Sequence, residues 1–216
     1  MVGLALLLSV GAWLARRSRE GLPEPKLLPV TTMSGSESYA SFSPDAQQVA
    51  FCWEGEGRAQ GVAPSNDIWV KFVSGMETRR LTSSPEDDWT PSWSPDGTRI
   101  AFVRLPTGTG VTTDSVGGLY VVSPLAGGER RLGDFPAEFS QLAWSPDSRF
   151  VAARRRRGSG ETAPAASGIY LVPVDGSEPR PLTTPPQPGW DTHPAFSTRR
   201  PGSTNASQRS PTSTWA

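Results

Sequence analysis

Short apolar runs recur along this chain, several of them alternating with polar residues, and turn-forming residues separate them. Residues 100–103 form such an apolar run after Arg99, and residues 68–70, 119–121 and 169–171 each combine aliphatic with aromatic side chains. Short runs of this kind between turns are typical of β-strands rather than of helices. The hydrophobic pattern therefore predicts an all-β protein built from short strands.

A phrase that returns at a fixed interval organises these strands. Its three complete copies consist of an aromatic residue followed by Ser-Pro-Asp, at residues 42–45, 93–96 and 144–147, so that successive copies are 51 residues apart. A fourth copy begins at residues 196–197 and is not completed. A period of about 50 residues is typical of propeller blades. Aligned on this phrase, each unit contains four β-prone stretches, which is the strand number of one blade.

Each position of the phrase has a structural interpretation. The aromatic residue should pack between neighbouring blades, the proline fixes φ in the turn, and the aspartate caps the turn with its side chain. Gly97 follows the second copy and accepts a positive φ, whereas Ala46 and Ser148 predict milder turns in the other copies. The residues assigned to this structural motif are Phe42, Pro44, Asp45, Trp93, Pro95, Asp96, Gly97, Trp144, Pro146 and Asp147.

The motif resembles the TolB-like, WD-like propeller repeats. The resemblance covers residues 28–197 and rests on the three phrases together with Asp67-Ile68-Trp69-Val70 as the third-strand element. It implies an all-β fold, an incomplete β-propeller of about three four-stranded blades. The expected blades span residues 39–88, 90–140 and 141–191, and a stub spans residues 192–197.

The resemblance is specific for the fold and unspecific for the function. Propellers of this type occur in the periplasmic Tol–Pal system and in front of prolyl-oligopeptidase-like and tricorn-like peptidases. They also occur behind the membrane helices of bacterial kinases and winged-helix regulators. An apolar helix followed by a proline-rich tether and blades looks most like this last group.

The amino terminus differs from the repeats. Residues 2–14 are apolar or small, and three arginines follow within residues 16–19. As a helix this run would rise about 20 Å, which is short of the roughly 30 Å hydrocarbon core of a bilayer. We interpret residues 1–19 as the trailing part of a membrane-anchor helix with a basic flank, followed by a proline-rich tether at residues 20–27. The alternatives are an uncleaved hydrophobic leader and a misassigned start.

Two further segments frame the repeats. Residues 28–32 resemble residues 180–184 and so predict an outer strand that completes the last blade of a closed ring. Residues 198–216 lack β alternation and are rich in Ser, Thr and Pro, which predicts a disordered tail. A frameshift at codon 198 is the alternative hypothesis, because a shifted reading of residues 198–201 can encode the expected Pro-Asp-Gly-Arg.

Composition narrows the chemistry. Lys plus Arg and Asp plus Glu both number 21, so no overall charge draws the chain to nucleic acid. Cys52 is the only cysteine and His193 the only histidine, which excludes an internal disulfide and leaves little material for a metal site or a Ser/His triad. His193 occupies the repeat position of Thr90 and Gln141, where a core or solvated histidine is a simpler interpretation than a channel-facing one. We therefore predict no enzymatic activity, no cofactor and no bound metal.

An acidic residue close to an aromatic one precedes each first strand of the repeat. These turns should share one face near the mouth of the central channel, where they would grip a cationic peptide or a metal ion. Inter-blade packing with solvated carboxylates is the simpler alternative. The candidate residues for this ligand face are Glu37, Tyr39, Asp88, Trp89, Glu138, Phe139, Trp190 and Asp191.

The favoured interpretation is a membrane-anchored, non-catalytic propeller that binds a protein or peptide partner, as scaffold or sensor, within a longer protein. The alternative is the N-terminal gating propeller of a prolyl-oligopeptidase-like or tricorn-like serine peptidase. The anchor predicts a single-pass protein of the bacterial inner membrane. The arginines at 16–19 favour a cytoplasmic carboxyl side, whereas the resemblance favours a periplasmic propeller, which we prefer. Unclosed blade edges also predict self-association.

Overall fold

The computed structural model describes six stretches of the chain. They span residues 27–55, 65–106, 116–136, 141–157, 166–186 and 189–197. The chain divides into two compact units, Met1–Thr32 and Met33–Ala216. Every regular element in the described stretches is a β-strand, and none of these stretches holds a helix that could cross a membrane. The predicted anchor at residues 1–19 and the tail at 198–216 lie outside the described residues, and residues 28–32 form no strand.

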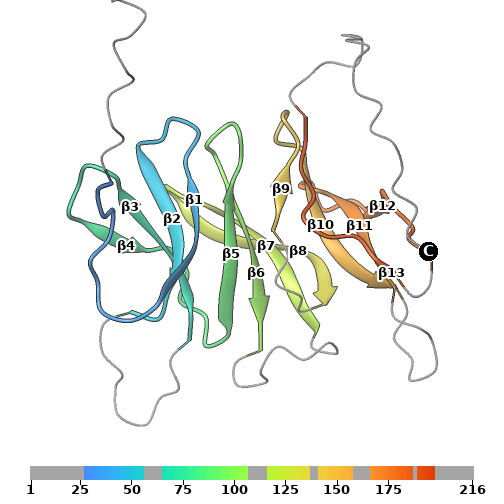
Figure 1. The fold of residues 1–216 in the computed structure, drawn as a ribbon, viewed down its shortest axis with the longest axis horizontal. Coiled ribbons are helices and arrows are strands. Elements are labelled where there is room, and N and C mark those ends of the chain that lie inside the picture. Colours follow the sequence, from blue (N-terminus) through green and yellow to red (C-terminus); the bar gives the residue numbers. More distant parts are fainter. Residues whose placement is uncertain are drawn as a thin grey trace, which may run out of the picture. The chain divides into compact units, whose positions relative to one another are not determined.

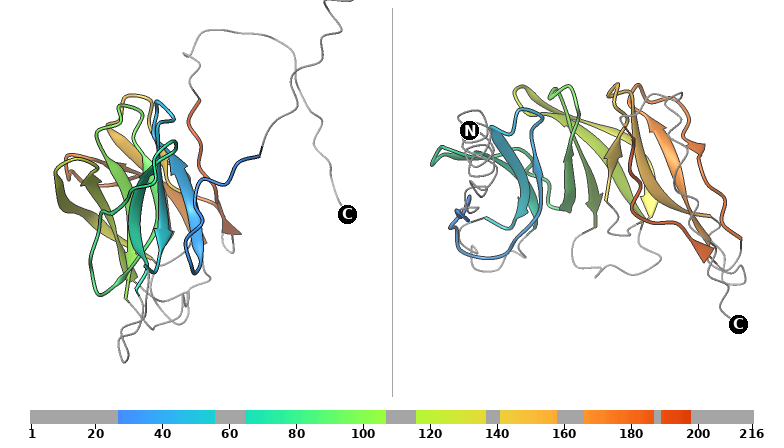
Figure 2. Two further views of the ribbon diagram at one scale, coloured as in Figure 1. Left: turned by 90° about the vertical axis from the view of Figure 1, so that its left-hand side faces the viewer. Right: turned by 45° about the horizontal axis from the view of Figure 1, so that its top comes forward.

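The unit Met33–Ala216 contains three β-sheets in its described residues, and they lie side by side in chain order (Figures 1 and 2). The first sheet consists of β1 (Glu37–Phe42), β2 (Gln48–Trp53), β3 (Asp67–Phe72) and β4 (Thr78–Arg80). The second consists of β5 (Asp87–Trp93), β6 (Ile100–Leu105), β7 (Val116–Ser123) and β8 (Gly127–Pro136). The third consists of β9 (Ala143–Trp144), β10 (Phe150–Arg157), β11 (Ala166–Pro173), β12 (Arg180–Pro181) and β13 (Gly189–Trp190).

Strand order within the sheets is that of propeller blades. Consecutive strands are antiparallel neighbours from β1 to β4, from β5 to β8 and from β9 to β12. The short strand β13 adds to β11 in parallel. The prediction of an all-β chain made of four-stranded antiparallel units is therefore confirmed for the described residues.

The Ser-Pro-Asp phrase closes the hairpin between the first and second strands of each sheet. In the second sheet Ser94 Oγ donates to Asp96 Oδ1 at 2.6 Å, and the same oxygen accepts the backbone N–H of Thr98 at 3.0 Å. Equivalent serine-to-aspartate bonds of 2.6 Å join Ser43 to Asp45 and Ser145 to Asp147. The serine hydrogen bond lowers the pKa of Asp45 and Asp147, so the carboxylates stay charged in this role.

The residue after each aspartate adopts a left-handed conformation in all three turns. Its φ is 55° at Ala46, 72° at Gly97 and 58° at Ser148. The prediction of milder turns at Ala46 and Ser148 is therefore wrong, because these residues adopt the same left-handed backbone as Gly97. Hydrogen bonds of the phrase impose the same backbone on residues for which this conformation is unfavourable.

The aromatic residue of the second and third phrases packs against the preceding sheet, whereas that of the first phrase does not. Trp93 is 8% exposed and lies in one core cluster with Ile68 of the first sheet and Phe102 of the second. Trp144 is 7% exposed and lies in the core cluster that the second and third sheets share. Phe42 is 54% exposed, because no sheet precedes the first one in the described part of the chain. Packing between blades thus holds for the two tryptophans but not for Phe42.

The fourth strand differs between the sheets, and one residue type accounts for the difference. Thr82 Oγ1 accepts the backbone N–H of Ile68 at 2.9 Å, and Thr183 Oγ1 accepts that of Ile169 at 2.9 Å. In both sheets the hydroxyl takes the place of a backbone carbonyl, and the fourth strand ends before it. The second sheet has Gly133 at this position, and β8 there continues its pairing with β7.

Candidate functional site

A β-bulge interrupts the first strand of the first two sheets at the same repeat position. The register shifts between Ser38 and Ser41 in β1, where two residues face a single residue of β2. The same shift lies between Trp89 and Ser92 in β5. A bulge bends its strand and re-aims the side chains around it, and bulges are common next to functional sites.

Three repeat-equivalent residues are held in the left-handed region at this position. Their φ values are 54° at Tyr39, 52° at Thr90 and 55° at His193. Positive φ is uncommon for residues other than glycine and is a true outlier for a β-branched residue such as Thr90. Each such residue stores about 1–3 kcal/mol of strain, which persists only where the surrounding structure enforces it. Strain repeated at one position of the fold points to this position as a candidate site.

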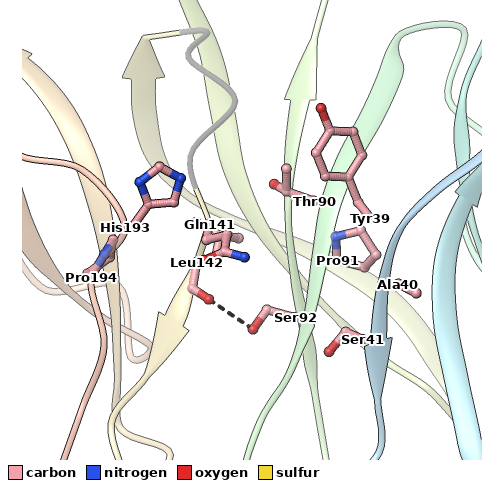
Figure 3. A pocket seen from close by; sticks show the side chains of 10 residues that line it. All are labelled: Tyr39, Ala40, Ser41, Thr90, Pro91, Ser92, Gln141, Leu142, His193 and Pro194. Carbon is pink, nitrogen blue, oxygen red and sulfur yellow. Dashed lines mark hydrogen bonds between the residues drawn. The ribbon is translucent and has the colours of Figure 1, made fainter.

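These residues border one pocket with a volume of about 450 Å³ (Figure 3). This volume lies in the range of about 300–1,000 Å³ that is usual for ligand sites. We call it the bulge pocket, and its lining residues are Tyr39, Ala40, Ser41, Thr90, Pro91, Ser92, Gln141, Leu142, His193 and Pro194. Four successive repeat units therefore contribute equivalent positions to a single hollow.

The serine and threonine hydroxyl groups of the bulge pocket differ in their hydrogen bonding. Ser92 Oγ donates to the carbonyl of Leu142 at 3.2 Å, and Ser41 Oγ accepts the backbone N–H of Trp93 at 3.1 Å. Thr90 is 6% exposed, and its Oγ1 has no hydrogen-bond partner among the described residues. Figure 3 shows this hydroxyl on the side of Thr90 that faces Gln141 and His193.

Among the described residues, the lining of the bulge pocket includes no Lys, Arg, Asp or Glu side chain. Within the described ranges no three His, Cys, Asp or Glu side chains come together in the manner that a metal site needs. The arrangement is therefore suited to hydrogen bonding and to packing against an uncharged ligand.

Three of the predicted ligand-face residues, Tyr39, Trp89 and Glu37, lie at different places in the structure. Tyr39 lines the bulge pocket, and its ring meets that of Trp89 edge-on with centroids 5.9 Å apart. Trp89 is half-buried and packs against the core on both sides of the second sheet. Glu37 begins β1 and is half-buried. Of these three residues, only Tyr39 reaches the pocket.

Asp88 belongs to a buried ion pair rather than to a ligand face. It is fully buried, and Arg104 Nε and Nη2 donate to its two oxygens at 2.7 and 2.9 Å. Arg104 Nη1 lies 2.7 Å from Glu129 Oε2, and its guanidinium stacks over the rings of Tyr120 and Phe102. Burial raises the pKa of Asp88, and the hydrogen bonds from Arg104 oppose this rise. The role of this carboxylate is structural.

The remaining candidates lie in the second and third units. Glu138 and Phe139 lie outside the described residues. Trp190 is 67% exposed in β13, and the backbone N–H of Asp191 donates to the carbonyl of Ser167 at 2.9 Å. Neither Trp190 nor Asp191 is among the lining residues of the bulge pocket.

Sequence reasoning missed most of the pocket. Its members besides Tyr39 and His193 are small or uncharged residues, such as Thr90, Ser92 and Gln141, which carry no catalytic or ligand motif. A signal was nevertheless present. Every lining residue stands one to three positions before the aromatic residue of a Ser-Pro-Asp phrase, and the repeat alignment superimposes these positions.

Together these features define the class of protein: a partial β-propeller of the TolB-like type, with a pocket along its first strands. No family model matches the chain. TolB from Acinetobacter baumannii is similar in structure, with a TM-score of 0.56 and 19% identity over 74% of this chain and 35% of TolB. A Mycobacterium tuberculosis puromycin-hydrolyzing peptidase gives a TM-score of 0.54 with 18% identity over 69% of this chain and 23% of the peptidase. The resemblance to TolB-like propellers is thus confirmed as a resemblance of fold.

Two curated proteins are similar in sequence. An uncharacterized peptidase of Bacillus subtilis, YuxL, is 27% identical over 121 residues, which are 56% of this chain and 17% of YuxL. Dipeptidyl-peptidase 5 of Porphyromonas gingivalis is 28% identical over 132 residues, which are 59% of this chain and 19% of that enzyme. This chain thus spans less than a fifth of either relative. Both relatives are named as peptidases, which contradicts the prediction of no enzymatic activity and points to a relation with peptidases.

Proposed function

We propose that this chain is the propeller part of a serine peptidase and controls which substrates reach a catalytic domain of the same protein. The observation that carries the proposal is the similarity to two peptidases across more than half of the chain. The aligned region accounts for only 17% and 19% of these relatives, which leaves most of their length for other domains.

The bulge pocket supports this proposal. A gating propeller has to contact a passing peptide without holding it tightly. The described lining residues of the pocket offer hydroxyl, amide and imidazole groups. None of these residues is a Lys, Arg, Asp or Glu. Charged walls would instead select strongly by charge and retain oppositely charged substrates.

The membrane tether is a separate proposal. It rests on the apolar residues 2–14, the arginines at 16–19 and the proline-rich segment that follows. We propose a single-pass anchor in the bacterial inner membrane with the propeller on the periplasmic side. Alkaline phosphatase fused after residue 190 is active if the propeller is exported, and an inactive fusion at normal expression places it in the cytoplasm.

The peptidase proposal is tested on the polypeptide that carries this propeller in cells. An antibody raised against residues 65–106 is used to precipitate it, and the precipitate is treated with a fluorophosphonate probe for active-site serines. We expect a labelled polypeptide well above the 23.1 kDa of this chain, with hydrolysis of aminoacyl or dipeptidyl coumarin amides. A precipitated polypeptide that neither reacts with the probe nor hydrolyses these amides would contradict the proposal.

A further inference from the structure

Thr90 combines two unfavourable features that packing alone does not require. Its side chain is buried at 6% exposure while its hydroxyl has no partner among the described residues. Its backbone is also held at a φ of 52°, which a β-branched residue rarely adopts. A valine would fill the same space without burying an unsatisfied hydroxyl. A buried hydroxyl that has no partner among the described residues therefore points to a hydrogen-bond partner that binds in the pocket.

The position of this hydroxyl identifies the bulge pocket as the place of binding. Thr90 lines the pocket between Tyr39 on β1 and Gln141 before β9 (Figure 3). The two serine hydroxyls nearby, of Ser41 and Ser92, already take part in hydrogen bonds within the protein. Of these three hydroxyls, that of Thr90 has no hydrogen-bond partner among the described residues and is therefore the one we assign to a ligand.

The lining restricts the chemistry of that ligand. Gln141 supplies an amide that donates and accepts, while Pro91, Leu142 and Pro194 supply apolar surface. The described lining residues include no Lys, Arg, Asp or Glu, so a charged group bound against them would lose its hydration without gaining a counter-charge. An extended peptide segment with uncharged side chains satisfies these conditions, because its main chain alternates donors and acceptors.

We propose that the bulge pocket binds an uncharged segment of an extended peptide, with Thr90 Oγ1 hydrogen-bonded to its main chain. The choice of a peptide rests on the proposed peptidase function, whereas the location of the site rests on the pocket itself. The pocket then selects peptide segments by the absence of charge as they pass the first strands of the propeller.

The single histidine makes this proposal directly measurable. His193 lines the pocket and is the only histidine of the chain, so its imidazole gives one assigned set of NMR signals. The chain is titrated with acetyl-tetra-alanine amide and with matched peptides in which the two central residues are Asp or Lys. We expect a saturable shift of the His193 signals with the neutral peptide and at least tenfold weaker binding of both charged peptides.

The variant Thr90→Val separates a ligand contact from a structural defect. We expect it to weaken binding of the neutral peptide about tenfold, which corresponds to about 1.4 kcal/mol, while the Tm of the free chain rises. Thr78→Val on the outer strand β4 is the matched control. It should change neither the affinity for the neutral peptide nor the Tm of the free chain. Gln141→Leu is a second test, because the exposed side chain of Gln141 does not support the core.

Each outcome decides between the hypotheses. Unchanged affinity of both Thr90→Val and Gln141→Leu, or equal binding of neutral and charged peptides, would overturn the proposal for the pocket. Peptide binding by a chain whose parent fails the fluorophosphonate test leaves the pocket standing and removes the peptidase. A labelled parent whose propeller shows no shift of the His193 signals removes the pocket and leaves the peptidase.

Discussion

The first and second sheets are built from equivalent residues, yet they are buried to different extents. The second strands β2 and β6 are both largely buried, but the first strands differ: Asp88, Thr90, Pro91 and Trp93 of β5 are buried, whereas β1 is half-buried to exposed along its length. The second sheet has a neighbour on both sides, and the first has a neighbour on one side only among the described residues. Burial of the first strand of a repeat therefore depends on whether the sheet of the preceding unit packs against it.

The strongest test of this comparison replaces each of two equivalent aromatic residues, Trp93 and Phe42, by alanine. Trp93→Ala should lower the free energy of unfolding by about 3–5 kcal/mol, because it opens a cavity between two sheets. Phe42→Ala should lower it by less than about 1 kcal/mol, since the Phe42 side chain is 54% exposed. Urea unfolding followed by circular dichroism measures both losses. Equal losses would show that Phe42 is buried by a neighbour outside the described residues.

A second test concerns the pair that opens each sheet. Asp88 and Arg104 occupy in the second sheet the register position of Glu37 and Trp53 in the first. Arg104→Ala should cost about 3–5 kcal/mol, because it leaves the carboxylate of Asp88 buried without a partner. Thermal and urea unfolding measure the loss.

Two controls sharpen this prediction. Arg80→Ala breaks the ion pair with the buried Asp67, but the Arg80 side chain is 45% exposed and Asp67 keeps the hydroxyl of Thr82 as a partner, so the loss should be clearly smaller than that of Arg104→Ala. The double variant Asp88→Asn/Arg104→Met should recover most of the stability lost in Arg104→Ala. A double variant as unstable as the single one would mean that packing of Arg104 on the rings dominates.

A third test exchanges the turn residues. Ala46→Gly should stabilise the chain by about 0.5–1 kcal/mol, because glycine relieves the left-handed strain at a φ of 55°. Gly97→Ala should destabilise it by a similar amount. A Cβ at Gly97 would meet only Pro44, at 3.8 Å, so the change is one of backbone conformation alone. Effects of the same sign for both variants, measured by thermal unfolding, would contradict this account.

The smallest expected effect is the pH dependence of Asp67, whose equivalent in the second sheet is Gly118. Burial raises the pKa of Asp67 to about 6, above its ordinary value of 3.8. The stabilising contribution of this group is thus fully present below about pH 4 and is lost as the pH rises through about 6. Asp67→Asn should remove a pH-dependent difference of less than about 1 kcal/mol between pH 4 and 7, since solvent at Arg80 screens the site. An identical pH profile for both proteins would disprove it.

The sequence was sufficient for the parts of the fold that depend on neighbours in the chain. The serine, proline and aspartate of each phrase act within five residues, as in the bond from Ser94 to Asp96. The four stretches per unit follow from short-range alternation and from the period of the phrase. These predictions succeeded because the interactions involved are local.

The candidate site was predicted poorly because it depends on contacts between strands that are separated in the sequence. Asp88 reads as an exposed acid beside an aromatic residue, but pairing of β5 with β6 brings Arg104 to it. The left-handed backbone of Tyr39 and Thr90 is imposed by the strand pairing around them, since neither residue favours it. The sequence analysis singled out only Tyr39 and His193 among the lining residues, although the repeat alignment superimposes all the lining positions.

By itself, the sequence determined the all-β class, the length of the unit and the chemistry of its turns, because hydrophobic alternation and turn hydrogen bonds act over a few residues. The tertiary structure decided which aromatics are buried, which carboxylate is neutralised by an arginine, and which uncharged residues meet in one pocket. Those outcomes require strands that are separated in the sequence to lie side by side, in one sheet or in neighbouring sheets, and no interaction between neighbours in the chain specifies them.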